Sequence, residues 1–223
     1  MKKTFLAISL ITLLVACGGS SGDKAKTGGK QEAATALGQS YTIDTTATTV
    51  NWRATHKGGL APRYGTIGVD KGVISVNNGA VTAGNIEINL ASLKVDPASV
   101  TEPDKKAANL EAHLKSPDFF NAATYPTAKF VITKIAAYDS TQQKSLLQGA
   151  TNLISGNLTL KDSTLNITFP AKITIGDNDV TATAKFTIDR SAWGISYKTD
   201  GSPENWMISK EVQIGFDLKA SKK

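Results

Sequence analysis

Short runs in which apolar and polar residues alternate make up most of this sequence after its first 40 residues. Leu165, Ile167 and Phe169 alternate with polar neighbours, and two longer runs of the same kind end the chain, Val180 to Ile188 and Val212 to Leu218. Alternation with a period of two is typical of half-buried strands. Eight or nine such runs, interrupted by one helical stretch, predict an all-β fold: an antiparallel up-and-down barrel of about eight strands with one short inserted helix.

The residues between the runs predict the connections. Asp70-Lys71-Gly72 has turn chemistry between strands at 65–69 and 73–76, which predicts a hairpin. The segment His56 to Arg63, with its Gly and Pro residues, predicts a loop at a barrel mouth. Pro170 has no N–H to donate to a strand ladder, so it marks a bulge or an edge.

The predicted inward faces carry several small residues. Ala54, Ala128, Ala182 and Ala184 would leave room for a ligand inside a barrel of about eight strands. The alternative is a barrel that its own side chains fill. The alternation of the sequence is compatible with both.

One segment has a helical pattern. Between Pro103 and Leu114, the spacing of Ala107, Leu110 and Leu114 places all three on one face of a short helix. A second helical turn should follow, because Ser116 and Pro117 have the pattern of an N-cap with proline at N1.

This second turn would point Phe119 and Phe120 inward, and its sequence resembles a family signature. In the YceI-like family of polyisoprenoid-binding proteins, a helix ends in HLRS-x-DFF. The matching residues here are His113, Leu114, Ser116, Asp118, Phe119 and Phe120. The chain departs from the family pattern at Lys115, where Arg is usual, and at Leu110-Glu111, where Arg-Asp is usual.

The resemblance continues beyond this signature and covers roughly residues 41–218. It includes Thr127 to Phe130, Gly156 to Lys161 and Phe186 to Ile195. It implies a lipocalin-like barrel that binds a polyisoprenoid. It also implies that a homodimer can form, and an edge near Pro170 would permit one.

The first 16 residues have the parts of a secretory signal: Lys2-Lys3, an apolar run, and small residues at the end. The run is too short for a membrane-spanning helix, which needs about 20 apolar residues. Leu14-Val15-Ala16-Cys17 resembles the bacterial lipobox, in which the cysteine is acylated and the signal is cut before it. Cys17 is the only cysteine, so it is the predicted lipid attachment site, and disulfides are excluded.

Residues 17–40 are rich in Gly, Ser, Ala, Thr and Lys and predict a lipidated flexible tether to a domain at 41–223. Asp does not follow Cys17. By resemblance to the lipoproteins of enteric bacteria, this favours the outer membrane, with the barrel in the periplasm.

The formal charge of +6 is spread along the chain, with a small cluster only at Lys219, Lys222 and Lys223 and no basic patch interleaved with aromatic residues. Nucleic acid is therefore a poor partner. A solvated, mildly basic surface is one interpretation, and attraction to anionic lipid head groups is the other.

Converging catalytic groups are scarce. His56 and His113 are the only histidines, and the sequence contains neither HExxH nor G-x-S-x-G. A metal site built from His113 with Glu111 or Asp118 is the alternative to a structural role for His113. Asp118 is expected to form an ordinary ion pair with Arg190 or Lys115. The sequence therefore predicts no metal, no cofactor other than a bound lipid, and no catalysis.

The hypothesis is a lipid-anchored barrel that carries or stores a polyisoprenoid or a similar amphiphile in an apolar cavity. The head group would meet His56, Arg63 and Lys115 at the mouth. Core packing is the alternative role for Phe119, Phe120, Trp193 and Trp206. The predicted ligand-binding residues are Trp52, His56, Arg63, His113, Phe119, Phe120, Phe130 and Trp193. The alternative function is a periplasmic stress-response or interaction protein whose filled barrel binds a protein partner.

Overall fold

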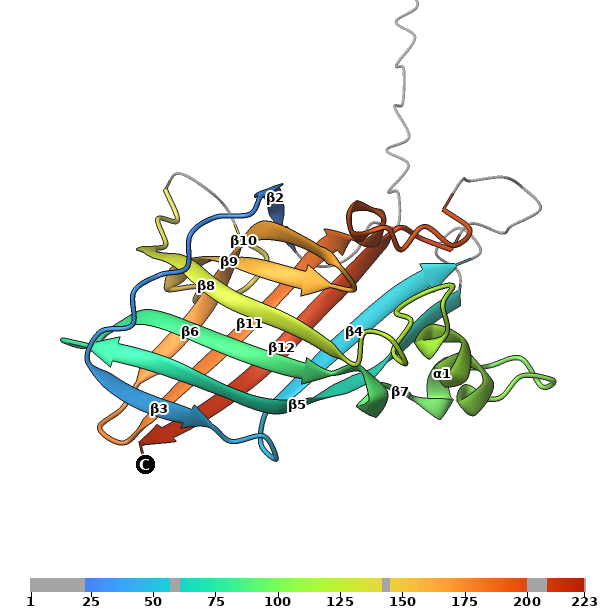
Figure 1. Cartoon of the computed structure of the whole chain (residues 1–223), viewed down its shortest axis with the longest axis horizontal. Coiled ribbons are helices and arrows are strands. Elements are labelled where there is room, and N and C mark those ends of the chain that lie inside the picture. The colour runs from blue at the N-terminus through green and yellow to red at the C-terminus, as the bar shows by residue number, and fades with distance from the viewer. Residues whose placement is uncertain (1–22, 57–60, 142–144, 200–207, 223) are drawn as a thin grey trace, which may run out of the picture.

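The computed structural model describes residues 23–56, 61–141, 145–199 and 208–222. These residues form an antiparallel barrel with one helix at one end (Figure 1). Eight strands make up its wall: β4 (Thr49–His56), β5 (Ala61–Asn77), β6 (Ala80–Asn89), β8 (Thr127–Ala137), β9 (Asn152–Leu160), β10 (Ser163–Ile175), β11 (Asp179–Asp189) and β12 (Glu211–Lys222). β12 pairs with β4, which closes the barrel and confirms the predicted fold.

Shorter elements complete the described chain. β3 (Gln39–Ile43) continues the line of β4, pairing with the end of β12 and the second half of β5. The others are β7 (Lys94–Val95), helix α1 (Ala107–Lys115) and the single 3-10 turns η2 (Leu90–Ser92), η3 (Pro97–Ser99) and η4 (Arg190–Trp193). Within the described residues, no helix has the length and hydrophobicity required to cross a bilayer.

β5 is one continuous strand, so the predicted hairpin with a turn at residues 70–72 is wrong. The first part of β5 pairs with β4 and the last part pairs with β3, so one strand serves two partners in succession. Against β6, the register shifts between Val69 and Lys71. The turn-like residues are therefore accommodated as a bulge, which adds one residue to a strand and bends it.

The predicted flexible tether is also wrong for residues 23–40, which are ordered on the barrel. β1 (Asp23–Lys24) pairs in parallel with β11, and β2 (Lys26–Gly29) pairs antiparallel with β10. From β2 the chain crosses the outer side of the barrel to reach β3 (Figure 1). We call residues 23–38 the N-terminal belt. Because backbone groups make most of its contacts, the belt needs few apolar side chains. The predicted signal peptide and Cys17 lie outside the described residues.

The belt fills a gap between two neighbouring strands. β10 and β11 pair only from Ala171–Ala184 to Ile175–Val180, and β2 occupies the next part of the β10 edge, at 165–168. Pro170 lies between these two partners, where β10 needs no donor on that side. It pairs in register with Leu153 of β9, so it marks a change of partner and forms no bulge there.

The helix is shorter than predicted. α1 begins at Ala107, and Ser116 is its C-cap, not the N-cap of a second helix. The N–H groups of Phe120 and Ala122 turn back to the carbonyls of Leu114 and Lys115 at 3.1 and 2.9 Å. These bonds satisfy carbonyls that a helix end leaves open, so the segment folds back as turns.

Candidate functional site

A cavity of about 640 Å³ runs through the interior of the barrel. Ligand pockets commonly measure about 300–1,000 Å³. Ala54, Ala128 and Ala182 border the cavity, as predicted, whereas Ala184 is buried outside its lining. The described interior is therefore open and not filled by its own side chains.

Four aromatic rings form part of the cavity wall. Phe169 stacks on Phe186 with ring centroids 4.0 Å apart, and it also contacts Phe130 and Phe216 at 5.7 and 6.0 Å. A Cβ at position 156 would overlap the ring of Phe130, so Gly156 makes the space in which that ring lies. Only Phe130 was a predicted site residue. Alternation placed the other three inward but could not show that they meet.

The cavity opens at the end of the barrel that carries α1. Its exposed lining residues are all at this end: Asp104, Lys105, Lys106, Asn109 and Lys198. At the opposite end of the barrel, which we call the closed end, the lining residues Thr48, Val180 and Leu218 are buried. The mouth is therefore polar with an excess of positive charge, and the interior is almost entirely apolar.

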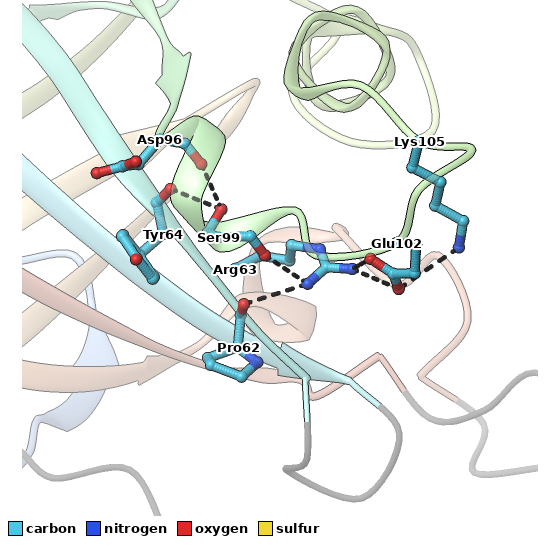
Figure 2. Close-up of polar contacts among 7 residues, drawn as sticks. All are labelled: Pro62, Arg63, Tyr64, Asp96, Ser99, Glu102 and Lys105. Atoms are coloured by element: carbon cyan, nitrogen blue, oxygen red, sulfur yellow. Dashed lines mark hydrogen bonds and ion pairs between the residues drawn. The ribbon is translucent and has the colours of Figure 1, made fainter.

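Arg63 and Glu102 form an ion pair at the mouth (Figure 2). The Nη2 of Arg63 donates to both carboxylate oxygens, at 2.7 and 2.6 Å, and Nη1 donates to the Ser99 carbonyl at 2.6 Å. The Nζ of Lys105 lies 3.7 Å from the same carboxylate. A hydrogen bond from its own backbone N–H, together with Arg63, lowers the pKa of Glu102 to about 2, against a smaller opposing effect of burial. Arg63 borders the cavity, but its guanidinium is engaged in holding this loop to β5.

Arg190, which was not among the predicted ligand-binding residues, is a second organising residue of the mouth. Its guanidinium is buried and donates to the carbonyls of Ser209, Ile195, Tyr197 and Ile208 at 2.7–3.1 Å. Burial lowers its pKa, which the neighbouring Asp189 opposes. The sequence could have indicated Arg190, because it directly follows a long alternating strand. The residue after such a strand lies at the rim of the barrel.

His113 lies between α1 and the turn that follows it. Its Nε2 is 2.9 Å from an oxygen of Asp118, so the predicted pairing of Asp118 with Arg190 or Lys115 is wrong. The imidazole meets the rings of Phe119 and Tyr197 edge-on, with centroids 5.1 and 5.0 Å apart. His113 therefore holds the turn against the mouth, where it also borders the cavity.

Glu111 has partners other than His113. Its carboxylate accepts a hydrogen bond from the Val95 N–H at 3.0 Å, which is the main cause of its lowered pKa, and lies 3.5 Å from the Nζ of Lys94. It thus ties α1 to β7. In the part of the chain that the structure describes, no three His, Cys, Asp or Glu residues gather as a metal site would require.

The other predicted residues divide into two groups. Trp52, His56, Phe119 and Phe120 border the cavity, and the Nε1 of Trp52 also donates to the Lys94 carbonyl at 3.2 Å. Trp193 does not border it: the side chain is buried and donates to the Leu158 carbonyl at 2.9 Å, which makes it a core residue. Lys115, at the end of α1, is also absent from the cavity lining. Trp206 lies outside the described residues.

The family model described as the YceI-like domain matches residues 41–220. This chain belongs to the YceI-like family. The match confirms the resemblance of the helix signature and its flanking strands. No curated protein matches the sequence.

Three solved structures are similar to this YceI-like protein in fold. BcnA from Burkholderia cenocepacia is 20% identical with a TM-score of 0.57, covering 80% of this chain and 99% of its own. A polyisoprenoid binding domain from Saccharophagus degradans is 15% identical with a TM-score of 0.54, covering 86% and 100%. A mutant YceI protein from Campylobacter jejuni is 19% identical with a TM-score of 0.50, covering 68% and 80%.

Proposed function

We propose that this YceI-like protein is a lipid-anchored, non-catalytic carrier or store for a polyisoprenoid or a similar amphiphilic lipid. The acylated Cys17 would hold it on the outer membrane, with the barrel in the periplasm. One observation carries the proposal: an apolar cavity of about 640 Å³ whose exposed lining residues, among those that the structure describes, form a polar mouth beside α1.

The chemistry of the lining favours an apolar chain. Aliphatic and aromatic side chains form the interior, and the charged lining residues lie at the α1 end. Burial of apolar surface is favourable by about 25 cal/mol per Å². A long isoprenoid is nearly insoluble in water, so a closed barrel can hold it in an aqueous compartment while its head group stays at the mouth.

The contacts of the mouth residues support binding without catalysis. Arg63, Arg190 and His113 each make the structural hydrogen bonds described above, with loop carbonyls, Glu102 or Asp118. The Saccharophagus domain with the same fold is described as polyisoprenoid binding, which agrees with this function.

Titration with geranylgeraniol, a 20-carbon isoprenoid alcohol, tests the binding. The protein is the chain from Gly18 to Lys223, which lacks the signal and Cys17 and is purified without detergent. Because Trp52 borders the cavity, we expect a saturable change in tryptophan fluorescence that is strongly reduced in Trp52→Phe. A signal that does not saturate would overturn the proposed binding.

The anchor is tested separately by fractionation of bacterial cells that express the full chain. We expect the unaltered protein in the outer-membrane fraction and Cys17→Ser, whose signal is neither acylated nor cut, in the inner-membrane fraction. Identical fractionation of the two proteins would overturn the anchor and leave the binding proposal standing.

A further inference from the structure

The N-terminal belt is fixed to the barrel along its length. Its first part is held by pairing of β1 with β11 and of β2 with β10, and the buried Ala25 lies between them. The backbone of Gln31 exchanges two hydrogen bonds with the side chain of Asn157, at 3.0 and 2.7 Å. Farther along, the Ala34 N–H donates to the Ile132 carbonyl at 2.9 Å. The described part of the predicted tether, residues 23–38, is therefore held on the barrel.

The belt begins close to the cavity mouth. Asp23 lies opposite Phe186, three residues before the mouth end of β11 and seven residues after its other end. At about 3.4 Å per strand residue, these separations are roughly 10 and 24 Å. The Nζ of Lys24 lies 3.0 Å from Glu211, which precedes the cavity-lining Val212 at the start of β12.

Only residues 18–22 lie between Cys17 and Asp23. Cys17 and Asp23 are six residue steps apart, and an extended chain rises at most about 3.6 Å per step, so this link spans about 22 Å at most. That length reaches past the mouth, roughly 10 Å from Asp23, and falls short of the closed end, roughly 24 Å away. The mouth is thus well within reach of a bilayer that holds Cys17, whereas the closed end lies at the limit of the fully extended link.

The rim of the mouth carries charge that suits a bilayer surface. Lys105, Lys106 and Lys198 are exposed there, with Asp104 as the exposed acidic lining residue. Each lysine near an anionic lipid surface raises the affinity for that surface roughly fivefold.

We propose that the mouth rim, formed by Lys105, Lys106, Asn109 and Lys198, docks on the surface of an anionic bilayer. The lipid ligand would then pass between membrane and cavity without crossing water. This inference rests on the proposed function, because it takes Cys17 as the anchor. It adds the orientation of the barrel and the membrane surface as the docking partner.

Energy transfer to the membrane tests the orientation in the full, acylated chain. Acylation blocks Cys17, so a single introduced cysteine can be labelled with a donor dye, either Asn109→Cys at the rim or Asn178→Cys at the turn of the closed end. The vesicles contain phosphatidylethanolamine, phosphatidylglycerol and an acceptor-labelled lipid. We expect higher transfer efficiency from position 109 than from position 178, and loss of part of that difference in about 1 M salt, where the Debye length is about 3 Å.

Charge variants test the role of the rim. The triple variant Lys105→Gln, Lys106→Gln, Lys198→Gln should reduce transfer from position 109. A matched triple variant of exposed lysines on the barrel wall, Lys134→Gln, Lys172→Gln, Lys185→Gln, should leave it unchanged. Equal transfer from both positions, as for a barrel lying on its side, would overturn the inference, as would higher transfer from position 178.

The outcomes separate this inference from the proposed function. Geranylgeraniol binding by the chain from Gly18 to Lys223 reports on the cavity alone, whatever the orientation. A chain that binds geranylgeraniol but shows equal transfer would retain the proposed function and lose the docking surface. A chain that is not acylated would lose both the anchor and the docking surface.

Discussion

The Nη2 of Arg63 donates hydrogen bonds to both carboxylate oxygens of Glu102, at 2.7 and 2.6 Å. The pair connects the second residue after the start of β5 to the loop that precedes α1. Only 11% of the Arg63 side chain and 18% of the Glu102 side chain are exposed. The loop that precedes α1 is therefore held against β5 at the mouth by an ion pair that is largely shielded from water.

Loss of one member of this pair should destabilise the fold more than loss of both. Arg63→Met leaves a partly buried carboxylate without its counter-charge, and we expect a loss of about 3 kcal/mol in the free energy of unfolding, at the low end of the range of roughly 3–5 kcal/mol for broken buried pairs. Arg63→Met with Glu102→Leu should recover most of this loss. Urea unfolding of the two variants measures the difference, and equal losses would contradict the assigned role of the pair.

The lowered pKa of Glu102, caused first by its own backbone N–H and then by Arg63, predicts an acid-sensitive part of the stability. The pKa of Glu102 is about 2 in the folded chain against a model-compound value of 4.5, so the unfolded chain binds a proton first as the pH falls. The stabilisation is present above pH 4.5 and is lost as the pH falls from there toward 2. Glu102→Gln should flatten this part of the pH dependence, measured by urea unfolding between pH 2 and 6. An unchanged slope would show that other carboxylates cause it.

A larger side chain inside the cavity should block the ligand. Ala182 borders the cavity on β11, and its neighbour Thr181 points outward and is exposed. Ala182→Phe should weaken geranylgeraniol binding at least about tenfold, equivalent to about 1.4 kcal/mol. Thr181→Phe adds the same ring outside and should bind as the unaltered protein does. Fluorescence titration compares the two, and equal affinities would place the ligand elsewhere.

The belt should loosen when its side-chain contact is removed. Asn157 is buried and makes both hydrogen bonds to the backbone of Gln31. Asn157→Ala removes both hydrogen bonds, each with a net value of about 0.5–1.5 kcal/mol, because water can replace the lost partner at the exposed Gln31. We expect faster amide hydrogen exchange at Gln31, whereas Asn85→Ala, at an exposed position on β6, should leave that exchange rate unchanged.

The alternation of apolar and polar residues predicted most of the barrel, because each strand has one polar face toward solvent and one apolar face toward the interior. Val212, Ile214 and Phe216 all border the cavity, as their shared face requires. The continuous β5 was missed because Asp70-Lys71-Gly72 has the composition of a turn, and only the presence of two successive partners, β4 and β3, shows that it is a bulge.

The belt could not be predicted because its contacts carry no side-chain pattern. The pairing of β2 with β10 is made by backbone groups of Lys26 to Gly29, a polar sequence that would be equally suited to a free linker. For the site, inward positions such as Trp52 were predictable from alternation. The partners of Arg63, Arg190 and Asp118 were not, since they depend on loops whose paths the sequence pattern does not determine.

Native mass spectrometry of the chain from Gly18 to Lys223, purified from bacterial cells without detergent, tests the central claim most directly. The account predicts a protein that carries a bound mass, which organic extraction identifies as a polyprenyl lipid or a similar amphiphile. An empty protein that also takes up no added polyprenyl lipid would contradict the account, and a protein partner would then become the leading explanation of its function.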